Sequence, residues 1–253
     1  MIPLRDQDAI RQRFGRDLTS RVRIDYFTQK SSPLYVAGRQ DCVYCKDVKT
    51  LLEELAALSD RISLSLHELA SAGALAKELG VDKVPGIVVR GGANRPVRFF
   101  GIPAGNEFAG FIETLIDAAR SSVDLRPETA KQLRKLKSDA RLQVFVTPTC
   151  PYCPALARTA LKLGLASARV KADVVEASEF PALVQRYAIR AVPTTVINDK
   201  LILAGAMDEA ALVQQIFRTV EGKAVAAGTA AGAATALSAA APAAGAGGLV
   251  LPR

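Results

Sequence analysis

An internal repeat is the feature that most constrains this chain. The sequence Cys42-Val-Tyr-Cys45 recurs 108 residues later as Cys150-Pro-Tyr-Cys153, and Val84-Pro85 recurs at the same offset as Val192-Pro193. Further identities at this offset, read without a gap, are Leu34 with Leu142, Val36 with Val144, Leu55 with Leu163, Glu68 with Glu176 and Val88 with Val196. One supersecondary unit of about 100 residues has therefore been used twice.

Each copy reads as the same order of elements. A short apolar run before each motif (34–37 and 142–146) predicts a buried strand, and helical periodicity follows each Cys-x-x-Cys. A second strand, a second helix, a β-hairpin after Val-Pro and a closing helix complete each copy. Ahead of the first copy, 8–18 predicts a helix and 22–27 a strand. This order predicts an α/β fold: two tandem units, each a mixed sheet with helices on both faces.

Composition shifts divide the chain. We predict an N-terminal unit over 1–120, a linker over 121–127, a C-terminal unit over 128–220 and a tail over 221–253. Ala and Gly make up 20 of the 33 tail residues, which lack large apolar side chains in register. The tail is therefore expected to be disordered, and no function is assigned to it.

Charge and hydropathy argue against a nucleic-acid-binding, a membrane-spanning or a secreted protein. The net charge is +8, but aromatic residues are only 6% of the chain, Trp is absent and the basic residues are spread over both halves. The densest basic cluster, 131–137, has leucines at helical spacing and is typical of a solvated helix face rather than a nucleic-acid site. No stretch predicts a membrane span or a secretory signal, so we expect a cytoplasmic protein.

The Cys-x-x-Cys pairs indicate redox chemistry. A free thiol has a pKa of ~8.5, and at the start of a helix the pKa falls to roughly 3.5–7.5 because unpaired N–H groups stabilise the thiolate. Cys42 and Cys150 are therefore the predicted nucleophiles, and Cys45 and Cys153 the resolving thiols. Asp41 beside Cys42 opposes its thiolate, so we predict that Cys150 is the more acidic and its site the more active.

Other interpretations of these residues remain open. Four cysteines in two pairs are compatible with a tetrathiolate zinc site, although each pair here opens its own helix. Tyr44 and Tyr152 share one place between the cysteines and are candidates for the rim of each site, or plain surface aromatics. His67 has no counterpart in the second copy and is predicted to be structural. The recurring Glu68 and Glu176 are predicted to cap the following helix.

These motifs resemble the thioredoxin/glutaredoxin superfamily. Over about residues 5–220 they closely resemble the two-unit protein disulfide oxidoreductases of thermophilic archaea and bacteria, through 99–108, 144–154 and Val175-Glu-Ala. The resemblance implies two thioredoxin-like units and cis peptide bonds before Pro85 and Pro193. It also implies substrate contacts in the same loops, at Val84, Pro85, Val192, Pro193 and Thr194. It also implies a dithiol–disulfide oxidoreductase without a bound organic cofactor. Protein disulfides would be its substrates, and a thioredoxin-reductase-like flavoprotein would supply electrons.

Two departures from that family bear on mechanism. Thioredoxins carry a buried carboxylate six residues before the first cysteine, where this chain has Val36 and Val144, so proton transfer must be arranged otherwise. The first site also lacks the Pro-Tyr dipeptide of glutaredoxins. One alternative is an electron carrier to a peroxiredoxin, resembling the amino-terminal module of flavin-dependent alkyl hydroperoxide reductases. Another, of a different class, is a zinc-binding or non-catalytic binding protein.

Overall fold

A computed structural model describes residues 2–30, 41–92, 95–120 and 122–222. The strands are β1 (Val22–Thr28), β2 (Ile62–Glu68), β3 (Gly86–Arg90), β4 (Val97–Phe100), β5 (Ala140–Val146), β6 (Val170–Glu176), β7 (Thr194–Ile197) and β8 (Leu201–Ala204). The helices are α1 (Leu4–Asp17), α2 (Cys45–Ala56), α3 (Gly73–Leu79), α4 (Asn106–Ala119), α5 (Pro127–Leu133), α6 (Cys153–Ala166), α7 (Pro181–Arg186) and α8 (Glu209–Glu221), with a 3-10 turn at Ala177–Glu179.

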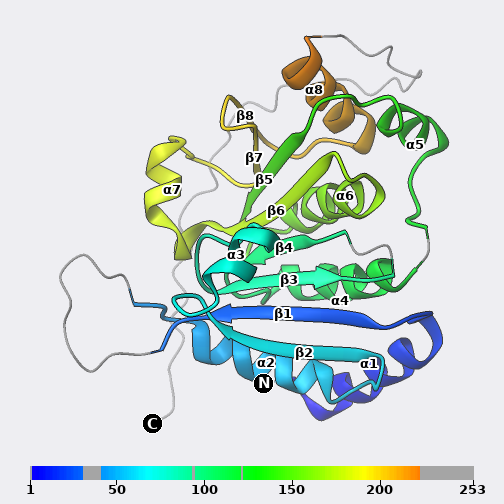
Figure 1. Cartoon of the computed structure of the whole chain (residues 1–253), viewed down its shortest axis with the longest axis vertical. Coiled ribbons are helices and arrows are strands. Elements are labelled where there is room, and N and C mark those ends of the chain that lie inside the picture. Colours follow the sequence, from blue (N-terminus) through cyan, green and yellow to red (C-terminus); the bar gives the residue numbers. More distant parts are fainter. Residues whose placement is uncertain (1, 31–40, 93–94, 121, 223–253) are drawn as a thin grey trace, which may run out of the picture.

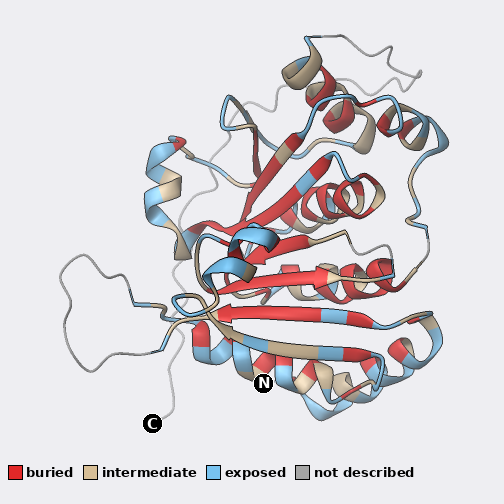
Figure 2. Cartoon of the chain, in the orientation of Figure 1, coloured by how far each residue is buried: buried red, intermediate tan, exposed pale blue. Residues whose placement is uncertain are grey.

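The eight strands form one mixed sheet in the order β2-β1-β3-β4-β6-β5-β7-β8 (Figure 1). The two repeats therefore share a sheet, joined where β4 pairs in parallel with β6. Helices cover both faces, as predicted: α1, α2, α4, α6 and α8 pack on one face, and α3 and α7 on the other. Strand residues alternate between the two layers, so Val144 belongs to the first core and Phe145 to the second. The central strands are mostly buried (Figure 2).

The prediction that the two copies align without a gap was wrong at the first strand of the first copy. β1 pairs with β2 as Val22 with Ile62, and β5 pairs with β6 as Ala140 with Val170. β1 and β5 are thus offset by 118 residues, whereas their partners keep the offset of 108. The first copy therefore carries ten extra residues between its central strand and Cys42, and the free-energy cost of lengthening a connection rises only slowly with its length.

β1 therefore occupies the place in the sheet that was predicted for 34–37. Ile24 and Tyr26, rather than Leu34 and Val36, correspond to Leu142 and Val144. The predicted strand at 34–37 lies outside the described residues. The strand predicted over 22–27 is confirmed, but it belongs to the first repeat rather than preceding it.

Buried charges reinforce the junction between the repeats. Arg98 on β4 is 4% exposed and pairs with Asp173 on β6, which is 0% exposed. The Arg98 guanidinium also donates to the Leu79 carbonyl at 3.2 Å, and Arg141 reaches the other Asp173 oxygen at 3.0 Å. The charged groups taken out of water here are paired, which is the condition for burying charge.

The ends of the second repeat follow the sequence in part. Pro127 begins α5, as a proline at a helix start predicts, and Gly222 ends α8 in a left-handed conformation with φ of 65°. Residues 223–253 lie outside the described residues, so the prediction of disorder there is not assessed. In the part of the chain that the structure describes, no helix has the length and hydropathy needed to cross a bilayer.

Candidate active sites

The two Cys-x-x-Cys motifs lie at the same edge of the sheet. β1 and β5 run in the same direction, and each motif follows the carboxyl end of its strand, with α2 beginning at Cys45 and α6 at Cys153. Three strands separate β1 from β5, so four spacings of ~4.8 Å place the sites about 19 Å apart. Four thiolates on one zinc ion need Zn–S distances near ~2.3 Å. This separation therefore rules out a zinc site shared by both pairs.

The first site contains a disulfide. Cys42 and Cys45 are bonded, with their Cα atoms 5.4 Å apart. Cys45 is buried and Cys42 is half-buried, so the first cysteine is the more accessible of the pair. The Tyr26 hydroxyl donates to the Cys45 carbonyl at 2.8 Å, and burial raises the pKa of Tyr26 to about 12. This buried phenol therefore remains a neutral donor beneath the first site.

The second site contains two thiols. Cys150 is 8% exposed and Cys153 is completely buried. The Cys150 sulfur lies 3.7 Å from the Val192 carbonyl oxygen, and its backbone N–H donates to the Thr147 carbonyl. Burial, and then the neighbouring Cys150 thiol, raise the pKa of Cys153 to about 12. Cys153 therefore needs a proton acceptor before it can attack a disulfide.

Both Val-Pro bonds are cis, as the resemblance implied. Val84 and Val192 are half-buried, whereas Pro85 and Pro193 are buried. The sulfur-to-carbonyl contact at the second site brings the Val192 backbone next to Cys150. Thr194, the fifth residue assigned to substrate binding in these loops, is buried, and its hydroxyl donates to the Ala191 carbonyl at 2.7 Å. Its side chain is therefore engaged within the loop.

The other residues singled out by the sequence have clear positions. Tyr44 and Tyr152 precede the two helices and are 40% and 70% exposed, at the rim of each site. His67 lies 3.0 Å from Asp25 and 5.0 Å from the Phe27 ring, a structural arrangement, as predicted.

The two recurring glutamates have different partners. Glu176 accepts from the N–H groups of Ser178 and Glu179, which confirms its capping role. Glu68 instead pairs with Lys30 at 3.0 Å, so capping is not repeated in the first copy. The chain that follows the strand differs between the two repeats, and the contacts of the recurring glutamate differ with it.

Sequence reasoning missed Glu107, the second residue of α4. Glu107 is 2% exposed, and one oxygen of its carboxyl has no hydrogen-bond partner among the described residues. Burial raises the pKa of Glu107 to about 7, and its charge contributes to the raised pKa of Cys153. Gly110, one turn further along α4, faces Pro154, the residue after Cys153. A carboxyl of the first repeat thus lies beside the second site.

Close backbone contact places α4 there. The Asn106 N–H donates to the Pro148 carbonyl at 2.9 Å, in the loop that carries Cys150. Gly105 has φ of 58°, and a Cβ at this position would lie 2.4 Å from the same carbonyl oxygen. Only glycine fits both conditions. Glu107 belongs to the 99–108 segment that carries part of the family resemblance, but no pattern in the sequence indicated that it faces the other repeat.

Comparisons with known proteins agree with this arrangement. Residues 140–218 match the thioredoxin domain family. An alkyl hydroperoxide reductase of Xanthomonas campestris pv. phaseoli is 25% identical over 183 residues, covering 72% of this chain and 33% of the relative. A Bacillus subtilis protein named NADH dehydrogenase is 25% identical over 172 residues, covering 68% and 31%. The chain thus spans about a third of the length of these relatives.

Two solved structures share the fold across both repeats. A protein disulfide oxidoreductase from Aeropyrum pernix matches with a TM-score of 0.78 and 23% identity, covering 90% of this chain and 97% of that one. The NTD_N/C domain of alkylhydroperoxide reductase from Enterococcus faecalis matches with a TM-score of 0.75 and 21% identity, covering 85% and 100%. This chain is therefore a thioredoxin-fold protein with two Cys-x-x-Cys pairs, similar to archaeal protein disulfide oxidoreductases and to the N-terminal part of alkyl hydroperoxide reductases.

Proposed function

We propose that the protein is a dithiol–disulfide oxidoreductase that acts on protein disulfides through Cys42–Cys45 and Cys150–Cys153. One observation carries the proposal: Cys150, which is 8% exposed, the completely buried Cys153 and the Glu107 carboxyl, with its unpartnered oxygen, belong to one site. This set contains a nucleophile, a resolving thiol and a proton acceptor, which are the groups that thiol–disulfide exchange needs.

The reaction at the second site follows from these positions. The Cys150 thiolate attacks one sulfur of a substrate disulfide, so a mixed disulfide forms and the other substrate sulfur leaves as a thiolate that takes up a proton. The Glu107 carboxylate then accepts the Cys153 proton. The Cys153 thiolate attacks the Cys150 sulfur, which forms the Cys150–Cys153 disulfide and releases the second substrate thiolate. Two electrons pass from protein to substrate, and the reverse sequence oxidises a dithiol.

The loops around the cis prolines provide a place for the substrate chain. Val192 lies beside Cys150 with its carbonyl oxygen 3.7 Å from the sulfur. A half-buried backbone at this position offers hydrogen bonds to an extended segment next to the reacting sulfur. Val84 likewise precedes the cis proline of the first repeat. Tyr152, mostly exposed at the rim, offers an apolar surface to the same substrate.

The test is dithiothreitol-dependent reduction of insulin by the full chain and by single Cys→Ser variants. The Cys150→Ser variant should lose most of the activity. The Cys153→Ser variant should accumulate a mixed disulfide with the substrate, detected by mass spectrometry. Native protein with no more activity than dithiothreitol alone would disprove the proposal.

A second candidate function is electron delivery to a peroxiredoxin. It is favoured by similarity to the alkyl hydroperoxide reductases, of which this chain spans about a third. A separate thioredoxin-reductase-like flavoprotein would then supply the electrons, in the cytoplasm. The distinguishing assay combines the protein, such a reductase and a peroxiredoxin, and follows peroxide-dependent NADPH oxidation. Dependence of the rate on this chain supports the second role.

A further inference from the structure

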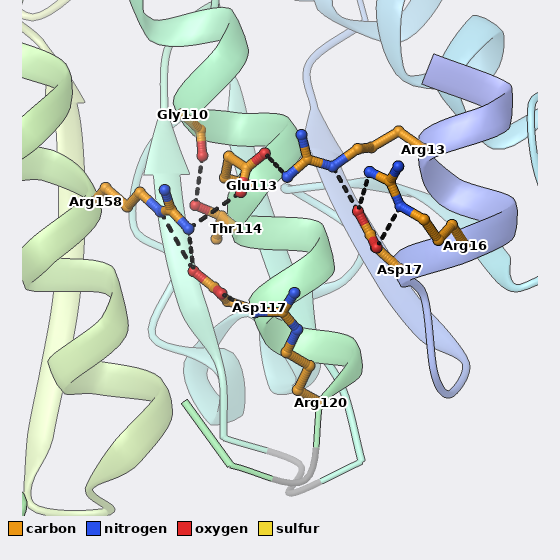
Figure 3. Close-up of polar contacts among 9 residues, drawn as sticks. All are labelled: Arg13, Arg16, Asp17, Gly110, Glu113, Thr114, Asp117, Arg120 and Arg158. Carbon is orange, nitrogen blue, oxygen red and sulfur yellow. Dashed lines mark hydrogen bonds and ion pairs between the residues drawn. The ribbon is translucent and has the colours of Figure 1, made fainter. Parts of the chain in front are cut away.

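Helices α4 and α6 lie against one another and bring a polar stripe of the first repeat onto the second (Figure 3). Along α4, Glu107, Gly110, Thr114 and Asp117 recur at intervals of three and four residues, so they share one face of the helix. Gly110 faces Pro154, and Thr114 turns its hydroxyl inward to the Gly110 carbonyl at 2.8 Å. The stripe begins at the second site with Glu107 and ends at the buried Asp117.

Arg158 of α6 binds the middle of this helix. Its Nη2 atom lies 3.1 Å from Glu113 and 3.3 Å from Asp117, and its Nε donates to Asp117 at 3.4 Å. Asp117 is 1% exposed, whereas Arg158 is about one third exposed. One guanidinium of the second repeat therefore connects two carboxylates of the first, and the planar fork of arginine suits such paired contacts.

The network extends to a third helix. Arg13 of α1 binds Glu113 at 2.7 Å and Asp17 at 2.6 Å, so Glu113 lies between two guanidinium groups (Figure 3). Arg120 approaches the remaining Asp117 oxygen at 3.6 Å. Helix α4 is thus held from both sides by charged contacts that fix its position along its axis.

The contacting residues lie at similar distances from the second site along the two helices. Glu113 lies six residues beyond Glu107, about 9 Å at 1.5 Å per residue, and Arg158 lies five residues beyond Cys153, about 7.5 Å. Both helices begin at the second site. The alignment of α4 along α6 that brings Arg158 to Glu113 and Asp117 is therefore the same alignment that places Glu107 near Cys153. Apolar contacts between helices are non-directional and set this register less sharply than paired ionic hydrogen bonds do.

We infer that Arg158 is a positioning residue that holds α4 in register with α6 and so keeps the Glu107 carboxyl beside Cys153. The inference rests on the proposed function. Among the described residues, nothing at the tip of Glu107 holds the oxygen that lacks a partner, so the helix must place it. At the corresponding place in the first repeat stands Thr50, whose hydroxyl donates to the Lys46 carbonyl, so this contact serves the second site alone.

The test measures disulfide resolution at the second site. Full-length protein with Cys42→Ser and Cys45→Ser is reacted with dithiobis(nitrobenzoate). One thionitrobenzoate is released when Cys150 attacks, and a second when Cys153 resolves the mixed disulfide. When Arg158→Gln is introduced into this protein, the second phase should slow at least tenfold at pH 7. The midpoint of the pH profile of the second phase should also fall, because water then reaches Glu107. Arg158→Lys should restore part of the rate.

Two controls separate positioning from stability. Arg169 forms an exposed ion pair with Asp139 at 3.0 Å and does not touch α4, so Arg169→Gln should leave both phases unchanged. Arg98→Lys weakens the sheet junction away from α4, so it should lower the melting temperature without moving the pH profile. A native rate and pH profile in Arg158→Gln would overturn the inference. If the Cys42→Ser and Cys45→Ser protein with its native Arg158 shows no second phase, the proposed function itself is contradicted.

Discussion

Replacing Glu107 by glutamine should make the protein more stable and less active. Burial raises the pKa of Glu107 from 4.5 to about 7, so the folded state holds this proton more tightly than the unfolded chain. Native stability must then fall as the pH rises from 4.5 through about 7, because the folded state has to bury a carboxylate. At ~1.4 kcal/mol for each tenfold change in proton affinity, the fall is at most ~3.5 kcal/mol.

The glutamine of this variant stays neutral at every pH and nearly keeps the shape of the protonated glutamic acid. The Glu107→Gln variant should therefore match the native free energy of unfolding near pH 4 and exceed it by up to ~3.5 kcal/mol at pH 8. It should also lose proton transfer from Cys153, and general acid–base groups typically contribute ~100-fold or more to such steps. Urea denaturation at several pH values measures the first effect. Stopped-flow release of thionitrobenzoate measures the second.

Glu179 provides a matched control. Burial also raises the pKa of Glu179 to about 7, but its carboxyl accepts from the Ile102 N–H at 2.6 Å. Glu179→Gln should therefore remove the part of the pH dependence of stability that Glu179 contributes, as Glu107→Gln removes the other part, but it should leave the resolution rate unchanged. A Glu107→Gln protein that resolves mixed disulfides at the native rate, or that keeps the native fall in stability with pH, would refute the assignment.

Three further outcomes are expected. Cys150 should be alkylated by iodoacetamide faster than Cys42 in reduced protein at pH 7, because the Asp41 carboxylate beside Cys42 opposes its thiolate; faster labelling of Cys42, measured by mass spectrometry, would contradict this. Arg98→Met should lower the free energy of unfolding by about 3 kcal/mol in urea denaturation, because it leaves a buried carboxylate with one partner fewer. Tyr26→Phe should cost about 1 kcal/mol of stability by removing the hydroxyl donor beneath the first site, and an unchanged melting curve would count against that role.

Much of the fold could be predicted because its signals are local. Each signal lies within one turn or one strand: the Cys-x-x-Cys spacing, the Val-Pro pairs and the alternation of apolar residues. Such signals can be recognised without knowing which element packs against them. The limit appears between β1 and Cys42, where ten extra residues shift β1 against the motif that follows it. A gapless match placed Val36 opposite Val144, whereas strand pairing places Tyr26 there. The boundaries of the two units remain a prediction.

The amino-acid sequence by itself determined that this chain repeats a thiol-bearing α/β unit, and it located the four cysteines to which we assign the chemistry. It also showed that the usual carboxylate was missing from its strand position. Only the tertiary structure decided where the proposed replacement lies: Glu107 comes from the other repeat, 46 residues before Cys153, and the packing of α4 on α6 brings it to the second site. That placement depends on how two distant helices meet, and no local pattern of residues encodes such a contact.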